Sequence, residues 1–231
     1  MKKILLSMIF LLLGVNALYA QTIEDWTKDF KVESHHFAST GTNTYFILEP
    51  NHYLILERQG ADEYERLVIS VLDETKIIDG LETRIVEERE SVNNELVEVS
   101  RNYYAFDTNT SSIYYFGEEV DIYEDGEIVD HHGEWISGKD GATFGLMMPG
   151  ITLIGSKYYQ EIAPDVAMDR AEIISVSESL TTPFSTFEGC LRVKETTPLE
   201  PGIHEYKIYA PGIGLIRDGN LLLVDWGYHD K

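Results

Sequence analysis

Aromatic side chains crowd the middle of this sequence, and they are the residues best suited to hold a small apolar or sugar ligand. The segment carries Tyr103, Tyr104, Phe106, Tyr114, Tyr115, Phe116, Tyr123 and Trp135. Side chains on a strand alternate between its faces, so Tyr104 and Phe106 share one face. Ile113 and Tyr115 share a face in the next segment. We predict a ligand-binding set on the concave face of a curved sheet, made of Tyr104, Phe106, Tyr115 and Trp135. The alternative is that the rings are good strand formers packed between layers.

Carboxylates are the second group able to do chemistry, because the sequence holds 40 Asp and Glu residues. Two carboxyl groups flanking a glycosidic bond can hydrolyse it. Nothing singles out such a pair, because the required separation is spatial. The adjacent glutamates at 87–88 and 118–119 are interpreted as solvated faces of strands or turns. We therefore predict no catalytic residue.

Histidines occur as adjacent pairs at 35–36 and 131–132. Adjacent residues of a strand point to opposite faces, so the second pair cannot chelate one ion from a strand. The segment 121–132 is similar to a calcium loop, but Tyr123 and His132 stand where that loop needs carboxylates. A β-hairpin on Asp125 and Gly126 accounts for the same residues. We predict no metal site and no cofactor.

Cys190 is the only cysteine, which excludes an internal disulfide framework and a cysteine-based zinc site. No neighbour activates it as a nucleophile, and no serine lies in a nucleophile elbow. Buried cysteines behave as small apolar residues, so we expect Cys190 in the core.

The formal net charge is −22. A nucleic-acid partner is excluded because phosphate binding needs a basic surface. Such acidity favours basic partners or divalent cations. The sequence identifies no protein partner.

The start of the chain is typical of a signal peptide. Lys2 and Lys3 precede an apolar run of about ten residues, which is too short to span a bilayer. We predict a signal peptide over 1–20, with cleavage after Ala20 or, alternatively, after Ala17. The mature protein is then exported, periplasmic or extracellular, without insertion into a membrane.

Short runs rich in Val, Ile, Tyr and Thr recur along the chain between Asp-Gly, Asn-Asn and Pro-Gly turns. They predict an all-β fold, an antiparallel meander that curls into a barrel, half-barrel or sandwich. One short N-terminal helix is expected around 23–30. Residues 21–231 form one domain, with an internal break at the glycine-rich segment 138–150. The expected strands cover 44–48, 52–57, 67–72, 82–91, 95–106, 112–116, 120–123, 127–136, 172–177, 190–195, 204–209, 213–217 and 221–226.

Two stretches near the C-terminus carry a resemblance. The segments TTPFSTFEGCLRV and EYKIYAPGIGLIRDG contain the pattern T-F-x-x-C-L followed by Y-x-A-P-G-I-G-L. This resembles a family of uncharacterised exported bacterial β-sheet proteins, loosely similar to lipocalins and lipoprotein carriers. The resemblance implies a bacterial exported origin and an all-β fold. It carries over no catalytic residue, and its motif residues are structural: Phe187, Cys190, Pro211 and Gly214.

We therefore expect a non-enzymatic exported protein that binds an apolar small molecule or lipid in a curved sheet. The first alternative is an interaction or structural module of the cell envelope, which would use its acidic surface or an open sheet edge. The second is a carboxylate-dependent hydrolase, which would need a cleft with two close acids of shifted pKa.

Overall fold

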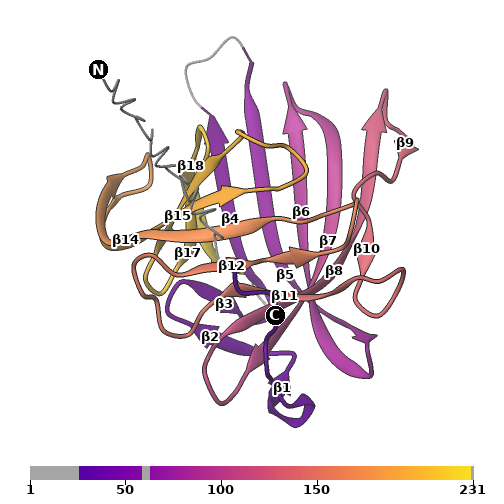
Figure 1. Ribbon diagram of the computed structural model, residues 1–231. Helices are drawn as coiled ribbons and strands as arrows, with labels where there is room; N and C mark the ends of the chain where they lie inside the picture. Colours follow the sequence, from indigo (N-terminus) through magenta and orange to yellow (C-terminus); the bar gives the residue numbers. More distant parts are fainter. Residues whose placement is uncertain (1–25, 59–62, 230–231) are drawn as a thin grey trace, which may run out of the picture.

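The computed structural model describes residues 26–58 and 63–229, and this part of the chain is almost entirely strand (Figure 1). A single 3-10 turn, Ser34–His36, precedes the first strand. The predicted all-β fold is confirmed. The strands are β1 (Phe37–Ala38), β2 (Gly41–Asn43), β3 (Phe46–Leu48), β4 (His52–Arg58), β5 (Glu65–Ile78), β6 (Leu81–Val92), β7 (Glu95–Asp107), β8 (Ile113–Glu124), β9 (Glu127–Asp130), β10 (Trp135–Ile136), β11 (Thr143–Met148), β12 (Lys157–Tyr159), β13 (Glu161–Ile162), β14 (Arg170–Thr181), β15 (Thr186–Thr196), β16 (Glu205–Ala210), β17 (Gly214–Asp218) and β18 (Leu221–Tyr228).

One antiparallel sheet of 16 strands runs in the order β12-β14-β15-β16-β17-β18-β4-β5-β6-β7-β8-β11-β13, and its other three strands pair beside this path, β1 with β7 and both β9 and β10 with β8. Its two end strands, β12 and β13, are separated along the chain only by Gln160. The sheet therefore nearly closes on itself as a barrel, one of the forms that the sequence predicted. The separate β2-β3 hairpin lies at the lower end in Figure 1.

Tight turns set the register of the long central strands. Asn93 and Asn94 have φ values of 52° and 68°, and Asp125 and Gly126 have 52° and 82°. Positive φ at both central residues is the geometry of a type I′ turn, whose twist matches that of paired strands. The β8-β9 hairpin on Asp125 and Gly126 is confirmed in place of a calcium loop.

Apolar side chains pack on both faces of the wall. The interior core includes Leu56, Leu67 and Leu223, which are almost fully buried. Outside the barrel, the N-terminal segment covers β7, β8 and β11. The ring of Phe37 lies edge-on to Tyr114 and Phe116, with centroids 5.5 and 5.3 Å away. Aromatic residues thus fill an outer layer as well as the interior.

The helix expected over 23–30 is absent from residues 26–30, which are extended. The Thr27 N–H donates to the carbonyl of Lys157 at 3.0 Å, and the Thr27 carbonyl accepts from the Tyr159 N–H at 2.9 Å. The edge of β12 thus satisfies the backbone N–H and carbonyl groups of Thr27, and a local helix would lose these two hydrogen bonds. Residues 23–25 and the predicted signal peptide over 1–20 lie outside the described residues.

The expected break at 138–150 contains a strand of the sheet. β11 pairs with β8 on one side and with β13 on the other. Among the described residues, no helix has the length and apolar character that crossing a bilayer requires.

Candidate functional site

The barrel interior contains three adjoining cavities, which we call the mouth, the waist and the floor. Their volumes are about 640, 180 and 60 Å³. The mouth and waist share Glu118, Glu161, Asp169 and Glu195. The waist and floor share Glu88, Tyr104, Met147 and Lys207. Because neighbouring cavities share wall residues, the three adjoin one another in the order mouth, waist, floor.

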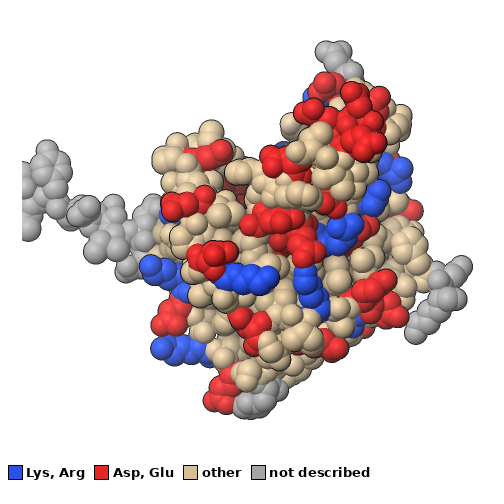
Figure 2. Space-filling view, turned by 90° about the vertical axis from the view of Figure 1, so that its right-hand side faces the viewer, with Lys and Arg blue, Asp and Glu red and all other residues tan. Residues whose placement is uncertain are grey.

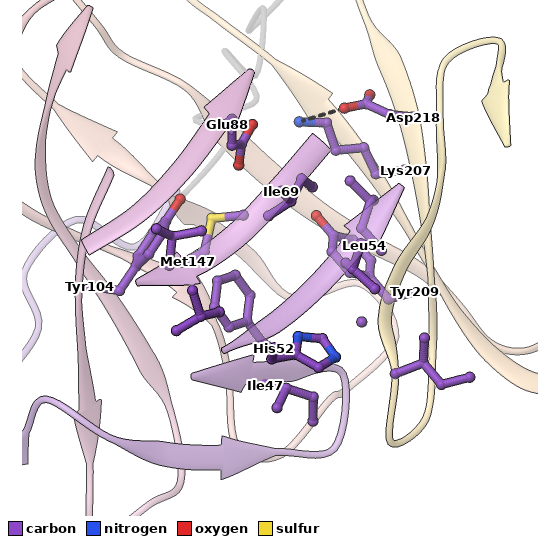
Figure 3. A pocket seen from close by; sticks show the side chains of 16 residues that line it. Ile47, His52, Leu54, Ile69, Glu88, Tyr104, Met147, Lys207, Tyr209 and Asp218 are labelled. Carbon is purple, nitrogen blue, oxygen red and sulfur yellow. Dashed lines mark ion pairs between the residues drawn. The ribbon is translucent and has the colours of Figure 1, made fainter. Parts of the chain in front are cut away.

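The floor is apolar, and Figure 3 shows its lining. Ile47, Leu54 and Ile69 face it from β3, β4 and β5. The ring of Phe46 lies edge-on to Tyr104, with the centroids 5.1 Å apart. The β2-β3 hairpin thus supplies two lining residues, Phe46 and Ile47, at this end of the interior.

His52 is the one histidine among the described residues that line the floor. It is 3% exposed, and its Nε2 has no hydrogen-bond partner among the described residues. Burial lowers the pKa of His52 to about 4. The imidazole is therefore neutral at physiological pH and adds no positive charge to the space.

The waist is strongly acidic. Only one basic side chain, Lys207, faces it. Figure 2 shows acidic side chains gathered on the upper part of the molecule as well, on both sides of a notch in its outline. The carboxyl groups that line the waist are those of Glu88, Glu90, Glu98, Glu118, Glu161, Asp169 and Glu195.

Strand alternation places Glu88 inside the barrel. On β6 it shares a face with Val86, which is 1% exposed and also lines the floor. Glu87 faces outward and lies 3.3 Å from the Arg101 guanidinium. The interpretation of both glutamates as solvated therefore holds only for the outer one.

A β-bulge places Glu118 inside. Along the β7-β8 ladder, Glu118 pairs with Asn102 and Tyr115 pairs with Tyr104, so Phe116 and Gly117 together oppose one residue of β7. A bulge of this kind shifts the alternation by one position. Glu118 consequently shares the inner face with Tyr115, which the sequence-based interpretation as a solvated turn missed.

Burial and mutual repulsion shift these carboxyl groups. Burial raises the pKa of Glu88 to about 8, and Asp218 adds to the rise although Lys207 opposes it. Burial also raises the pKa of Glu118 to about 7, against a hydrogen bond from Tyr115. The pKa of Glu161 stands well above its ordinary value, first through burial and then through the charge of Glu118.

Lys207 is held by two carboxylates. Its Nζ lies 3.1 Å from Glu195 Oε2 and 3.6 Å from Asp218 Oδ2. Burial alone would lower the pKa of Lys207, but Asp218 and Glu195 together raise it well above its ordinary value. The amine is therefore protonated throughout the neutral range.

Two of the four aromatic residues predicted to bind a ligand line the open space. Tyr104 lines the floor and waist, and Tyr115 lines the waist and donates a hydrogen bond to Asn102 Oδ1. The two rings are 4.7 Å apart. Trp135 packs edge-on to Tyr115 at 5.2 Å and lines a fourth cavity of about 300 Å³, which shares Glu118 with the waist and the mouth.

Phe106 lies away from the open space. Its ring packs over Gly41, where a Cβ atom would come within 2.3 Å of it. On β7 it lies on the same face as Tyr104, but near the end of the strand, where β1 pairs at Phe106. Tyr104 and Phe106 share a face of β7 but lie at different positions along the strand. Alternation predicts the face of a side chain and not its position along the barrel, so it grouped the two residues together.

The sequence analysis missed the charged residues of the interior. Two spacing signals pointed to them: Glu88 and Glu90 stand two and four residues after the inward Val86 on β6, and Lys207 and Tyr209 alternate on β16. Glu161 and Asp169 gave no signal, since they flank the turn between β13 and β14. In the described part of the chain, no three His, Cys, Asp or Glu side chains converge to hold a metal ion.

No protein-family model, curated protein or solved structure matches this chain.

Proposed function

We propose that this protein is an exported, non-enzymatic binding protein that holds a small organic molecule inside its barrel. The observation that carries the proposal is the row of adjoining cavities from the mouth to the floor. A barrel built only for stability fills its interior with side chains. Here the interior instead keeps a mainly apolar floor and a larger mouth.

The size of the floor sets the kind of ligand. Its volume is about 60 Å³, whereas a dry cavity that binds benzene has about 150 Å³. The apolar part of the ligand is therefore short, and a long lipid chain would extend back into the acidic waist. Tyr104 stands where the apolar and polar parts of the ligand would meet.

Native mass spectrometry tests the proposal on protein purified gently from its host. We expect an added mass of roughly a few hundred daltons that disappears on denaturation. Ile69→Phe fills the floor and should lose this mass. Val68→Phe adds the same ring on the opposite face of β5 and should keep it.

Hexanol titration tests the protein when it is purified without a ligand. Methyl chemical shifts of Ile47, Ile69 and Ile213, which line the floor, should change together and saturate. The outward Ile77, which is 65% exposed, serves as the internal control. Unchanged shifts at the three lining residues would contradict the proposal.

A second candidate function is a carboxylate-dependent hydrolase, which Glu118 and Glu161 favour. Both line the mouth and the waist, and the charge of Glu118 adds to the effect of burial in raising the pKa of Glu161. Nitrophenol release from a panel of nitrophenyl glycosides tests it. We expect Glu118→Gln and Glu161→Gln to abolish release and the exposed Glu127→Gln to retain it. No release by the wild-type protein would rule this candidate out for these substrates.

A further inference from the structure

We propose that the ligand of the barrel interior is a small organic amine, with its ammonium group in the acidic waist and a short apolar end in the floor. This inference rests on the proposed function and names the chemical class of the ligand. Four features support it: the acidic side chains of the waist, the unpartnered amide oxygen of Gln160, the ammonium group of Lys207 and the sizes of the cavities.

The charge of the waist is the first step. Seven carboxyl groups line it, and the one basic side chain is Lys207. Lys207 is already engaged by Glu195 and by Asp218. In the part of the chain that the structure describes, Glu88 and Glu161 have no ion-pair partner. A second anion would add to the repulsion that raises the pKa of these carboxyl groups, whereas a cation would favour their ionised form and pair with it.

A buried amide without a partner is the second step. Gln160 is 5% exposed and lines the waist. Its Nε2 donates to Glu195 Oε1 at 3.0 Å, whereas its Oε1 is buried with no hydrogen-bond partner among the described residues. An unsatisfied buried acceptor is costly. An ammonium group offers three donors, so it can satisfy this oxygen and the neighbouring carboxylates together.

The side chain of Lys207 is a precedent within the molecule. Its apolar stem runs along the wall above the floor, and its ammonium lies between carboxylates, as Figure 3 shows for Asp218. The interior therefore already stabilises an alkylammonium group. Tyr104 and Tyr115 line the same space, and aromatic faces attract cations.

The dimensions fix the orientation of the ligand. The apolar floor lies against the β2-β3 hairpin, and the waist shares wall residues with both the floor and the mouth. An amine that enters with its apolar end first places the ammonium level with Glu88, Glu161 and Gln160. The exposed Val166, Leu199 and Ile203 at the mouth offer apolar surface along the entry path.

Calorimetric titration with three six-carbon probes tests the inference. Hexylamine, hexanol and hexanoate share one apolar chain and differ in the charge of the head group. We expect hexylamine to bind at least about tenfold more tightly than hexanol, and hexanoate to bind most weakly. Hexanol binding as tightly as hexylamine would overturn the amine assignment and leave the proposed function standing. If none of the three binds, the proposed function itself fails.

Calcium chloride is the fourth probe, because an acidic space can also attract a divalent ion. We expect millimolar calcium to change the dissociation constant of hexylamine by less than about threefold, relative to a calcium-free buffer of the same ionic strength. Tight calcium binding that excludes hexylamine would overturn the assignment in favour of a metal ion.

Matched variants locate the ammonium. Glu88→Gln and Glu161→Gln keep the side-chain shape and remove a carboxyl group that can ionise when an ammonium group binds beside it. Each should weaken hexylamine binding by about tenfold and change hexanol binding by less than about twofold. Glu127→Gln removes an exposed charge on β9 and should change neither. Equal effects of Glu88→Gln on both probes would indicate a merely structural role and contradict the assignment.

Discussion

The ammonium nitrogen of Lys207 lies 3.1 Å from a carboxylate oxygen of Glu195, on the neighbouring strand, inside the barrel. The same nitrogen lies 3.6 Å from Asp218 on the strand at the other side of β16. One cation thus connects β15, β16 and β17 at the level where the wall is most acidic. This arrangement makes Lys207 central to both stability and binding.

Replacing Lys207 with alanine should lower the stability of the protein. Removing one partner of a buried ion pair leaves the other charge unpaired, at a cost of about 3 kcal/mol in the free energy of unfolding. Urea unfolding followed by circular dichroism measures the loss. Propylamine, which replaces the missing stem and ammonium, should restore part of it.

Lys139→Ala is the matched control, because Lys139 is exposed. Its unfolding midpoint should stay close to that of the wild type, with or without propylamine. A Lys207→Ala variant as stable as Lys139→Ala would show that the interior ion pairs contribute nothing.

Stability should fall as the pH rises from about 5 to about 8. Glu88 has an ordinary pKa of 4.5, which burial raises to about 8 in the folded protein, and Lys207, Asp218, Glu90 and Glu118 face it. Between these values the folded state binds more protons than the unfolded state. The stabilisation that Glu88 contributes is complete below about pH 4.5 and is lost as the pH rises through about 8.

Glu88→Gln tests this dependence, because glutamine keeps the neutral form at every pH. Urea midpoints of the variant should change less with pH than those of the wild type and should be higher at about pH 8. Glu127→Gln should follow the wild-type curve. A midpoint for Glu88→Gln that changes with pH as steeply as the wild type would contradict the inward, shifted Glu88.

Gly117→Ala should destabilise the barrel and disturb Glu118. Gly117 has a φ of 137°, and a Cβ there would come within 2.4 Å of the Trp135 carbonyl oxygen. Strain and the backbone shift together should cost about 2 kcal/mol or more. Gly126→Ala is the control, since Gly126 also has positive φ but open space around it. Equal losses in the two variants would show that the Trp135 contact is unimportant.

Cys190 should be unreactive in the folded protein. It is 0% exposed, and burial raises the pKa of its thiol, helped by the charges of Glu188 and Glu178. A thiol reagent such as dithionitrobenzoate should label it slowly in native buffer and rapidly in urea. Labelling at the same rate in both would place the thiol at the surface.

The strands of the barrel could be predicted because alternation and turn residues are local signals. The segment predicted over 52–57 is β4, and Leu67, Ile69 and Val71 are buried as their spacing indicates. β5 nevertheless runs on to Ile78, six residues past the predicted end at residue 72. Its far end is held by pairing with β6, which no local pattern reveals.

Long-range contacts account for what the sequence did not indicate. Three Pro-Gly-Ile segments were expected to form similar turns, and Gly202 and Gly212 do have positive φ values of 95° and 75°. Gly150 differs, because a Cβ there would come within 1.7 Å of the Thr110 carbonyl oxygen. The inward acids were missed for the same reason, since the bulge at Gly117 and the closure of the barrel decide which glutamates face the interior.

The near closure of the sheet also limits how this protein can associate through its backbone. The two ends of the sheet are β12, with three residues, and β13, with two. A second chain that adds a strand needs a longer row of free N–H and carbonyl groups. Thr27 already occupies part of the outer edge of β12. Fibre growth and strand exchange from these two ends are thereby disfavoured. Contacts between molecules at these ends would be made by side chains and not by backbone hydrogen bonds.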